Sequence, residues 1–453
     1  MSRKGRFLLV MVIAILLSAC MPQGPYRVRP DPPPGEHGQL VPNLHFDASK
    51  SRQCKTINAT DSCINFVEFD EFGNPFSRQQ LNTGVSAASK AATDNGDVVV
   101  YIHGWHHTSR PGDEDVDHFQ ELINRANLSG GGRRTVGVYV SWRGDSIDTD
   151  IPLVGLSSYL LTFWDRKSTA HNIGAGGGVS ELLRKLSTIR EENPKSRLVI
   201  IGHSFGGAIL YSSISQTLGD QIRRDAKGGA GAKMLSVADL VVLVNPAFEA
   251  MRLKPLFDMA RSYNYEIGTR PSLVIVTTTA DWATKNTFPL GRVFGTLFQH
   301  HPNHEFWSLD TTAVGHYIPL VTHQLVVKEC TPQYDQPELL AALTPNKTYC
   351  IPARKAAYGV GDVPSMLWTR CESPGDCDKV VGNEYLKRGA AEQGYMPYRF
   401  PIANIRTDAS VMTGHTDIWN DRMSNFLYEL LAAVRENSVL LPVPMMSPTD
   451  DAE

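Results

Sequence analysis

The segment around Ser204 constrains the fold of this chain more than any other. Residues 198–201 read Leu-Val-Ile-Ile, and this apolar, mostly β-branched run predicts a short buried strand. Gly-His-Ser-Phe-Gly follows at 202–206, and residues 208–218 continue with an apolar helical face. A strand, a G-x-S-x-G turn and a helix in this order predict a nucleophile elbow, where a serine lies at the apex of a strained turn. Glycines flank it because a Cβ would clash where strand and helix pack closely.

The overall composition is that of an ordinary globular protein. The chain has 453 residues, of which 42% are hydrophobic and 20% charged, so it is long enough to bury a large core. The formal net charge is −3 and no long run of Lys and Arg occurs. We therefore expect no nucleic-acid partner.

The N-terminus has the features of a targeting segment. Basic residues within 3–6 precede an apolar stretch over 7–17, which is too short to span a bilayer comfortably. Leu-Ser-Ala-Cys follows and ends at Cys20. This pattern resembles a bacterial lipobox, which implies a signal peptide over 1–19 and a diacylglycerol on Cys20. With Met21 next, the resemblance implies a lipid-anchored protein of the cell envelope, sorted to the outer membrane and facing the periplasm or surface; a plain secretory signal or a short anchor are the alternatives.

The remaining cysteines agree with export to an oxidising compartment. Six are left besides Cys20, an even number that predicts three disulfides. A zinc site is disfavoured because the spacings lack C-x₂-C pairs. Pairing by sequence proximity predicts the bonds Cys54–Cys63, Cys330–Cys350 and Cys371–Cys377.

Strand and helix patterns alternate along most of the chain, which predicts an α/β fold with a mostly parallel central sheet and helices on both faces. A closing amphipathic helix is expected over 421–437. The predicted core strands are 97–103, 135–142, 197–202, 239–245, 272–278 and 399–406.

Composition shifts divide the chain into segments. A proline-rich tether over 20–45 is expected to hold the folded domain away from the membrane. The core then covers 46–298, and 299–398 forms a cysteine-containing insertion before the last core strand, where it caps the site or decorates a distant surface. The last strand, a histidine loop and the C-terminal helix occupy 399–437, and 438–453 is a tail.

The elbow and its strands resemble the α/β-hydrolase fold over residues 95–437, and within it lipase- and esterase-like serine hydrolases. The resemblance implies an oxyanion hole made of two backbone N–H groups. One belongs to Phe205, the residue after the nucleophile. The other follows an earlier strand, where Tyr-Ile-His-Gly-Trp at 101–105 matches an H-G-x pattern. Gly104 lets the backbone approach, Trp105 supplies the N–H, and His106 is the alternate.

The resemblance also implies a base and an acid in the chain order Ser, Asp or Glu, His. His415 lies between the last strand and the final helix and fits the base; His316 is its rival. Asp281 follows a predicted strand and fits the acid, although an aspartate there also suits a helix cap. Some lipases carry the acid one strand earlier, where this chain reads Asn245-Pro246-Ala247, and Glu249 is the remaining alternative there.

These residues imply a carboxylic ester hydrolase that acts through a Ser-His-Asp triad and an acyl-enzyme, with a small-molecule or lipid ester as substrate and no metal or organic cofactor. The same site on the same fold also serves acyltransferases, thioesterases and amidases. A non-catalytic envelope lipoprotein that keeps the scaffold for binding is a third possibility. The sequence leaves the oligomeric state open.

Overall fold

The computed structural model describes most of the chain from Gly24 onward. The described residues are 24–30, 44–45, 49–57, 60–129, 132–144, 155–226, 236–265, 271–329, 348–351, 354–355, 362–370 and 400–436. The proposed signal peptide, Cys20 and the tail all lie outside these ranges.

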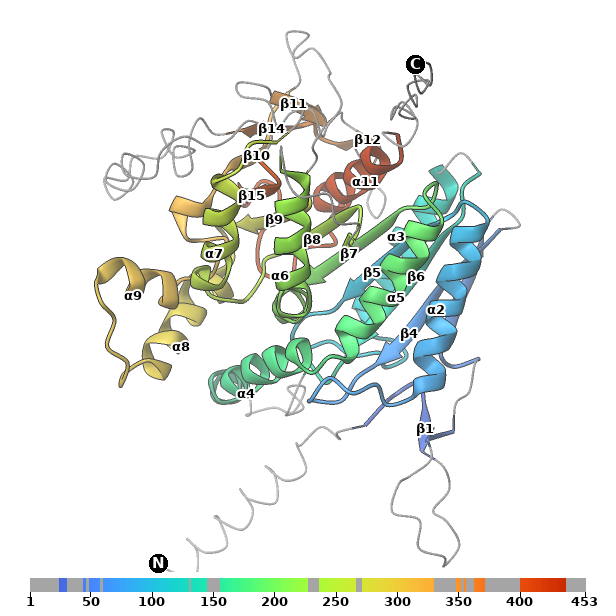
Figure 1. The fold of residues 1–453 in the computed structure, drawn as a ribbon, viewed down its shortest axis with the longest axis horizontal. Helices are drawn as coiled ribbons and strands as arrows, with labels where there is room; N and C mark the ends of the chain where they lie inside the picture. Colours follow the sequence, from blue (N-terminus) through green and yellow to red (C-terminus); the bar gives the residue numbers. More distant parts are fainter. Residues whose placement is uncertain are drawn as a thin grey trace, which may run out of the picture.

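A large mixed sheet organises the molecule (Figure 1). Its eleven strands run in the order β11-β14-β10-β15-β9-β8-β7-β5-β6-β4-β3. The eight strands from β10 to β4 in that order are mutually parallel, and the antiparallel strands lie at the two ends. The α/β class and the mostly parallel sheet are thus confirmed. The strands are β3 (Arg52–Ile57), β4 (Thr60–Glu68), β5 (Asp97–Ile102), β6 (Thr135–Ser141), β7 (Leu198–His203), β8 (Leu240–Val244), β9 (Leu273–Thr278), β10 (His323–Val327), β11 (Thr348–Ile351), β14 (Met366–Arg370) and β15 (Ile402–Thr407). Two short ladders lie apart from this sheet: β1 (Arg29–Pro30) with β2 (Leu44–His45), and β12 (Arg354–Lys355) with β13 (Asp362–Val363).

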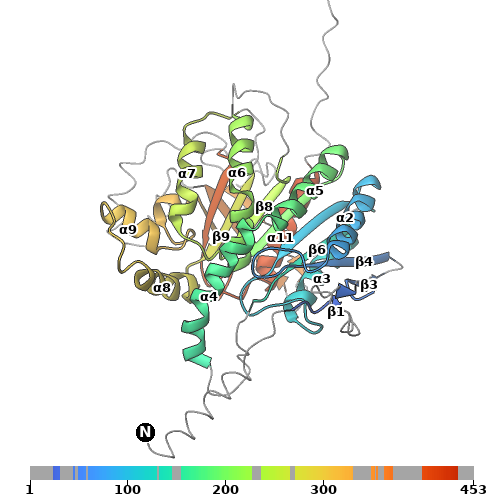
Figure 2. The ribbon, with the colours of Figure 1, turned by 60° about the horizontal axis from the view of Figure 1, so that its bottom comes forward.

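Helices cover both faces of the sheet (Figures 1 and 2). One core cluster joins the sheet to α2 and to the helices from α4 through α9, and the other joins it to α3 and α11. The helices are α2 (Arg78–Thr93), α3 (Glu114–Ser129), α4 (Gly155–Ala175), α5 (Gly178–Glu192), α6 (Phe205–Asp225), α7 (Ala250–Arg261), the π-turn η1 (Ala283–Thr287), α8 (Phe288–Gly295), α9 (His304–Thr311), the short 3₁₀ turn η2 (Ile318–Leu320) and α11 (Asp421–Glu436). Within the described ranges, no helix combines the length and the apolar composition needed to cross a bilayer.

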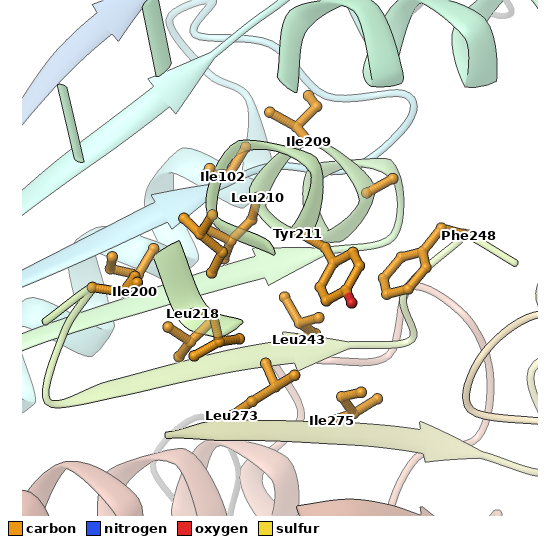
Figure 3. Packing of buried hydrophobic residues seen from close by; sticks show 14 of the residues in the cluster. Ile102, Ile200, Ile209, Leu210, Tyr211, Leu218, Leu243, Phe248, Leu273 and Ile275 are labelled. Carbon is orange, nitrogen blue, oxygen red and sulfur yellow. The ribbon is translucent and has the colours of Figure 1, made fainter. Parts of the chain in front are cut away.

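The central strands are apolar on both faces because helices bury both sides. Every residue of β5, β6, β7, β8 and β9 is buried. Figure 3 shows α6 lying on this surface, with Leu210 and Leu218 packed toward the strands and the Tyr211 ring stacked on Phe248, centroids 4.7 Å apart. Each such buried side chain stabilises the fold by about 1.5–3 kcal/mol relative to exposure. The helix that follows Ser204 is therefore held firmly against the sheet.

The predicted insertion over 299–398 takes part in the main sheet. Its strand β10 pairs with β15, and β14 and β11 extend the sheet beyond β10. Helix α9 packs against α7 and α8, with which it forms a lobe beside the carboxyl ends of the strands. The insertion therefore both extends the sheet and builds structure at one edge.

Part of the segment expected to be a tether, 20–45, lies on the folded domain. The backbone N–H groups of Tyr26 and Arg27 donate to the Glu68 carboxylate, at 2.6 and 3.0 Å. The Arg27 guanidinium lies 4.0 Å from the centroid of the Phe66 ring, and Val28 is buried. Residues 24–28 are thus part of the domain. The tether prediction was wrong for them because Arg27 is buried and the amides of Tyr26 and Arg27 bind Glu68, although the surrounding composition is proline-rich.

The Cys54–Cys63 disulfide is confirmed and links β3 to β4. The partners are direct neighbours across this antiparallel pair, with Cα atoms 4.1 Å apart. Cys330, Cys371 and Cys377 lie outside the described residues, and the Cys350 side chain is likewise not described.

Candidate active site

Ser204 lies at a strained turn between β7 and α6. Its backbone adopts φ 53° and ψ −121°, a conformation that residues with a Cβ rarely occupy. Its N–H donates to the Val244 carbonyl at 3.0 Å, which ties the turn to β8. A Cβ at Gly206 would lie 2.2 Å from the Ile102 carbonyl oxygen, so only glycine fits where α6 passes β5.

The structure brings Ser204, His415 and Asp281 together from three distant parts of the chain. His415 Nδ1 lies 2.7 Å from Asp281 Oδ2, and His415 Nε2 lies 2.6 Å from Ser204 Oγ. A carboxylate only accepts hydrogen bonds, so Nδ1 carries the proton and donates it to Asp281. Nε2 is then the acceptor for the Ser204 hydroxyl, the tautomer that a general base needs.

Asp281 is fully buried and lies three residues after the end of β9. Burial alone would raise the pKa of its carboxyl, but His415 and the hydrogen bonds from His415 and Thr284 outweigh burial and lower the pKa to about 2. The Thr284 N–H donates to Oδ1 at 3.0 Å, and its hydroxyl donates to Oδ2. Asp281 therefore both caps the turn that follows it and contacts His415. The two interpretations of this aspartate, as a cap and as the acid beside the histidine, are compatible with each other.

The rival histidine, His316, contacts Thr284. His316 Nε2 is 2.8 Å from the Thr284 hydroxyl, which donates its own proton to Asp281, so His316 reaches the acid only through Thr284. Burial lowers the pKa of His316 to about 4, and the neutral Nε2–H donates to Thr284. Sequence reasoning missed Thr284; its place three residues after the candidate acid, as a capping partner, is the signal that could have identified it.

The alternative acid, Glu249, belongs to a separate buried ionic cluster. Its carboxylate contacts Lys167 Nζ at 2.5 Å, Arg252 Nε at 2.8 Å and Arg292 Nε at 3.1 Å. Burial raises the pKa of Glu249, but the attraction of Lys167 and Arg292 is stronger and lowers it to about 2. The Glu249 carboxylate is thus paired with these three cations and also contacts His171, whereas His415 contacts Asp281.

Two side chains hold the backbone carbonyl of His415. His203 Nε2 donates to this oxygen at 3.0 Å, and Asn245 Nδ2 donates to it at 3.0 Å. Burial, with repulsion from His415, keeps the pKa of His203 well below its usual value, so its ring is neutral. Asn245, at the position where some lipases carry the acid, also accepts from the Thr278 N–H at 3.2 Å. Both residues position the histidine loop, a role the sequence did not indicate.

The loop after β5 lies directly against the serine. A Cβ at Gly104 would lie 2.9 Å from Ser204 Cβ and 2.8 Å from the His203 ring, so the loop approaches this closely because residue 104 is glycine. His103 Nε2 accepts from the Trp142 N–H at 3.1 Å, and its Nδ1–H donates to the Gly104 carbonyl at 2.8 Å. With that carbonyl held by His103, the trans peptide directs the Trp105 N–H the opposite way.

Phe205, the residue after Ser204, carries the other backbone amide expected for the oxyanion hole. It is the first residue of α6, where an N–H group has no carbonyl partner within the helix. An aromatic cluster continues from it: the Phe163 ring lies 5.5 Å from Phe205 and 5.9 Å from Trp105. His106, at φ 70°, stacks on Trp105 with centroids 4.4 Å apart. An aromatic cluster thus joins the loop after β5 to the first residue of α6.

The arrangement places a serine hydroxyl, an imidazole and a buried carboxylate in one chain of contacts. Over the described residues, no group of three or more His, Cys, Asp or Glu side chains is placed to hold a metal ion. These side chains suit acyl transfer through the serine.

Comparisons with known proteins add little to this geometry. No protein-family model and no curated protein matches the chain. Among solved structures, a weak likeness extends to phospholipase PlaB from Legionella pneumophila, with 13% sequence identity and a TM-score of 0.20, over 60% of this chain and 51% of that one. The match thus spans about half of that protein, and at such a score it assigns neither fold nor activity.

Proposed function

We propose that this chain is a serine hydrolase of the α/β-hydrolase type that cleaves carboxylic esters. The observation that carries the proposal is the chain of contacts from Ser204 through His415 to Asp281, at 2.6 and 2.7 Å. The strained conformation of Ser204 and the packing of Gly104 against it support the same conclusion.

In the proposed mechanism, Ser204 Oγ attacks the ester carbonyl while His415 Nε2 takes its proton. The Trp105 and Phe205 N–H groups stabilise the oxyanion. The tetrahedral intermediate collapses, the ester C–O bond breaks, and His415 returns the proton to the leaving alkoxide. Water, deprotonated by the same imidazole, then attacks the acyl-enzyme and releases the carboxylic acid and free Ser204.

Labelling with a fluorophosphonate, together with hydrolysis of a short-chain p-nitrophenyl ester, tests the proposal. The wild-type chain is expected to be labelled and to turn over the ester, and Ser204→Ala to lose both. Absence of labelling in folded wild-type protein would favour the non-catalytic alternative. Products trapped by added alcohols instead of water would favour an acyltransferase.

The choice of base has its own test. His415→Ala is expected to reduce turnover by orders of magnitude because no other imidazole contacts Ser204 Oγ among the described residues. His316→Ala is expected to retain most of the activity. The reverse pattern would show that the assignment is wrong.

We further propose that Cys20 is lipidated and that the protein resides in the bacterial envelope, at the outer membrane facing the periplasm or surface. The support is the sequence alone: a basic start, an apolar stretch and Leu-Ser-Ala-Cys. Cys20→Ser should abolish metabolic labelling with a fatty-acid analogue, whereas Cys54→Ser should not. Labelling that persists in Cys20→Ser would remove the lipoprotein hypothesis.

A further inference from the structure

Large exposed apolar side chains are concentrated in one segment of the chain. Among the described residues, eight large hydrophobic side chains are strongly exposed, and six of them lie between residues 282 and 307. The Phe298 side chain, in the turn after α8, is 103% exposed and so extends fully into solvent. We call these residues the apolar lobe: Trp282, Leu290, Leu297, Phe298, Phe306 and Trp307. Clusters of this kind mark interaction surfaces.

The apolar lobe lies at the carboxyl edge of the sheet, the same edge as the candidate active site. Trp282 follows Asp281 directly after β9, and Ser204 follows β7. The end of α9 is tied to the residues after β8 through the Val314 N–H, which donates to the Phe248 carbonyl at 2.9 Å. Figure 1 shows α8 and α9 together beside the strand tips.

The start of the folded domain lies at this edge as well. Tyr26 and Arg27 bind the carboxylate of Glu68, the last residue of β4, and β4 is parallel to the strands that carry the site. Cys20 precedes Gly24 by four residues, a distance that an extended chain spans with at most about 14 Å. A lipid on Cys20 would therefore hold this edge, rather than the opposite one, close to the membrane.

The apolar lobe and the start of the folded domain lie on opposite sides of Ser204 along this edge. Five strand spacings separate β9 from β4, roughly 24 Å at about 4.8 Å each, and β7 lies between them. The exposed Phe72, in the loop after β4, adds an apolar side chain at the anchor end. Two contacts this far apart would fix the orientation of the edge between them.

The composition of the apolar lobe fits a bilayer as its occupant. Tryptophan, phenylalanine and leucine are the residues that enter the interfacial region of membranes. Between 282 and 307, the exposed Lys, Arg, Asp and Glu residues are Lys285 and Glu305, and His300 and His304 are exposed as well, so few formal charges would have to leave water. A fully projecting Phe298 needs no matching pocket in a fluid layer of acyl chains.

We infer that the apolar lobe is a docking surface for a phospholipid bilayer, and that with the anchor at Cys20 it turns the carboxyl edge of the sheet, which carries Ser204, toward the membrane. The inference rests on the proposed function and on the proposed lipidation, and it names the substrate class: esters presented by the membrane itself.

Vesicle binding without the lipid anchor tests the surface alone. The chain beginning at Met21 keeps every residue that the structure describes and lacks Cys20. Carrying Ser204→Ala, it is mixed with sedimentable vesicles of phosphatidylethanolamine and phosphatidylglycerol in a ratio of about 3:1. The double variant Leu297→Ser/Phe298→Ser is compared with Leu128→Ser, an exposed leucine on the last turn of α3, near the opposite edge of the sheet.

We expect the double variant to lose at least about tenfold in vesicle partitioning and Leu128→Ser to stay within about twofold. Equal binding by all three chains, or no binding by the parent, would overturn the inference, as would a parent chain that self-associates through this surface. Thermal unfolding of each variant checks that it is folded. Failure of the proposed function is distinguishable, because it shows as absent fluorophosphonate labelling in the Ser204 chain, whereas the vesicle assay needs no activity.

Discussion

Replacing Asp281 with asparagine should disable His415 without disturbing the fold, and the structure explains why. Oδ1 accepts from the Thr284 N–H at 3.0 Å, so this position must remain an oxygen. The new NH₂ group therefore takes the Oδ2 position, where it faces His415 Nδ1 in place of an acceptor. The imidazole then keeps its proton on Nε2 and cannot accept one from Ser204.

The expected loss in kcat is about 10⁴-fold, the size found when the aspartate of a serine-protease triad becomes asparagine. At 1.36 kcal/mol per factor of ten, this corresponds to about 5.4 kcal/mol of activation free energy. The assay is steady-state hydrolysis of a p-nitrophenyl ester, with circular dichroism to verify folding. A loss below about tenfold in a folded variant would refute the assignment of Asp281 as the orienting acid.

Three further outcomes are expected. Glu249→Gln removes the counter-ion of buried Lys167 and should lower the free energy of unfolding at pH 7 by about 3 kcal/mol in urea titrations, with turnover of the folded protein retained. The pKa of Glu249 in the folded state, about 2, lies below its ordinary value of 4.5. The stabilisation is therefore complete above pH 4.5 and is lost as the pH falls toward 2, so the stabilities of the variant and the wild type should converge in acid. Gly104→Ala should reduce kcat more than it raises KM, because its Cβ would lie 2.8 Å from the His203 ring; unchanged kcat would argue against the loop's placement. Cys63→Ala should lower stability by about 2–3 kcal/mol, a difference that disappears when wild type is measured in reductant.

The central part of the fold could be predicted because its signals are local. Strands buried on both faces read as continuous apolar runs, so β5 to β9 were predicted to within a residue or two. The turn at Ser204 could be predicted because Gly206 must be a glycine where α6 passes close to β5. Order along the chain then favoured His415 over His316, since the base precedes the final helix, although the contact with Ser204 spans 211 residues.

The parts that the sequence did not reveal depend on partners far along the chain. Composition around residues 24–28 is typical of a spacer, yet their amides find the Glu68 carboxylate some forty residues away. Likewise, β10 and β14 show no alternation strong enough to stand out; β10 is placed by its pairing with β15, and β14 by its pairing with β10. His203 and Asn245 hold a backbone carbonyl, and such a contact leaves no trace in residue type or spacing.

The position of β15 sets the order in which the site can be completed. This strand lies between β9 and β10, although β10 precedes it in the chain, so the sheet stays divided until residues 402–407 are inserted. During synthesis from the N-terminus, Ser204 and Asp281 emerge long before His415. The contact between His415 and Ser204 therefore forms only when the last strand and the loop that follows it dock. A prematurely terminated chain would carry Ser204 but lack the imidazole that contacts it.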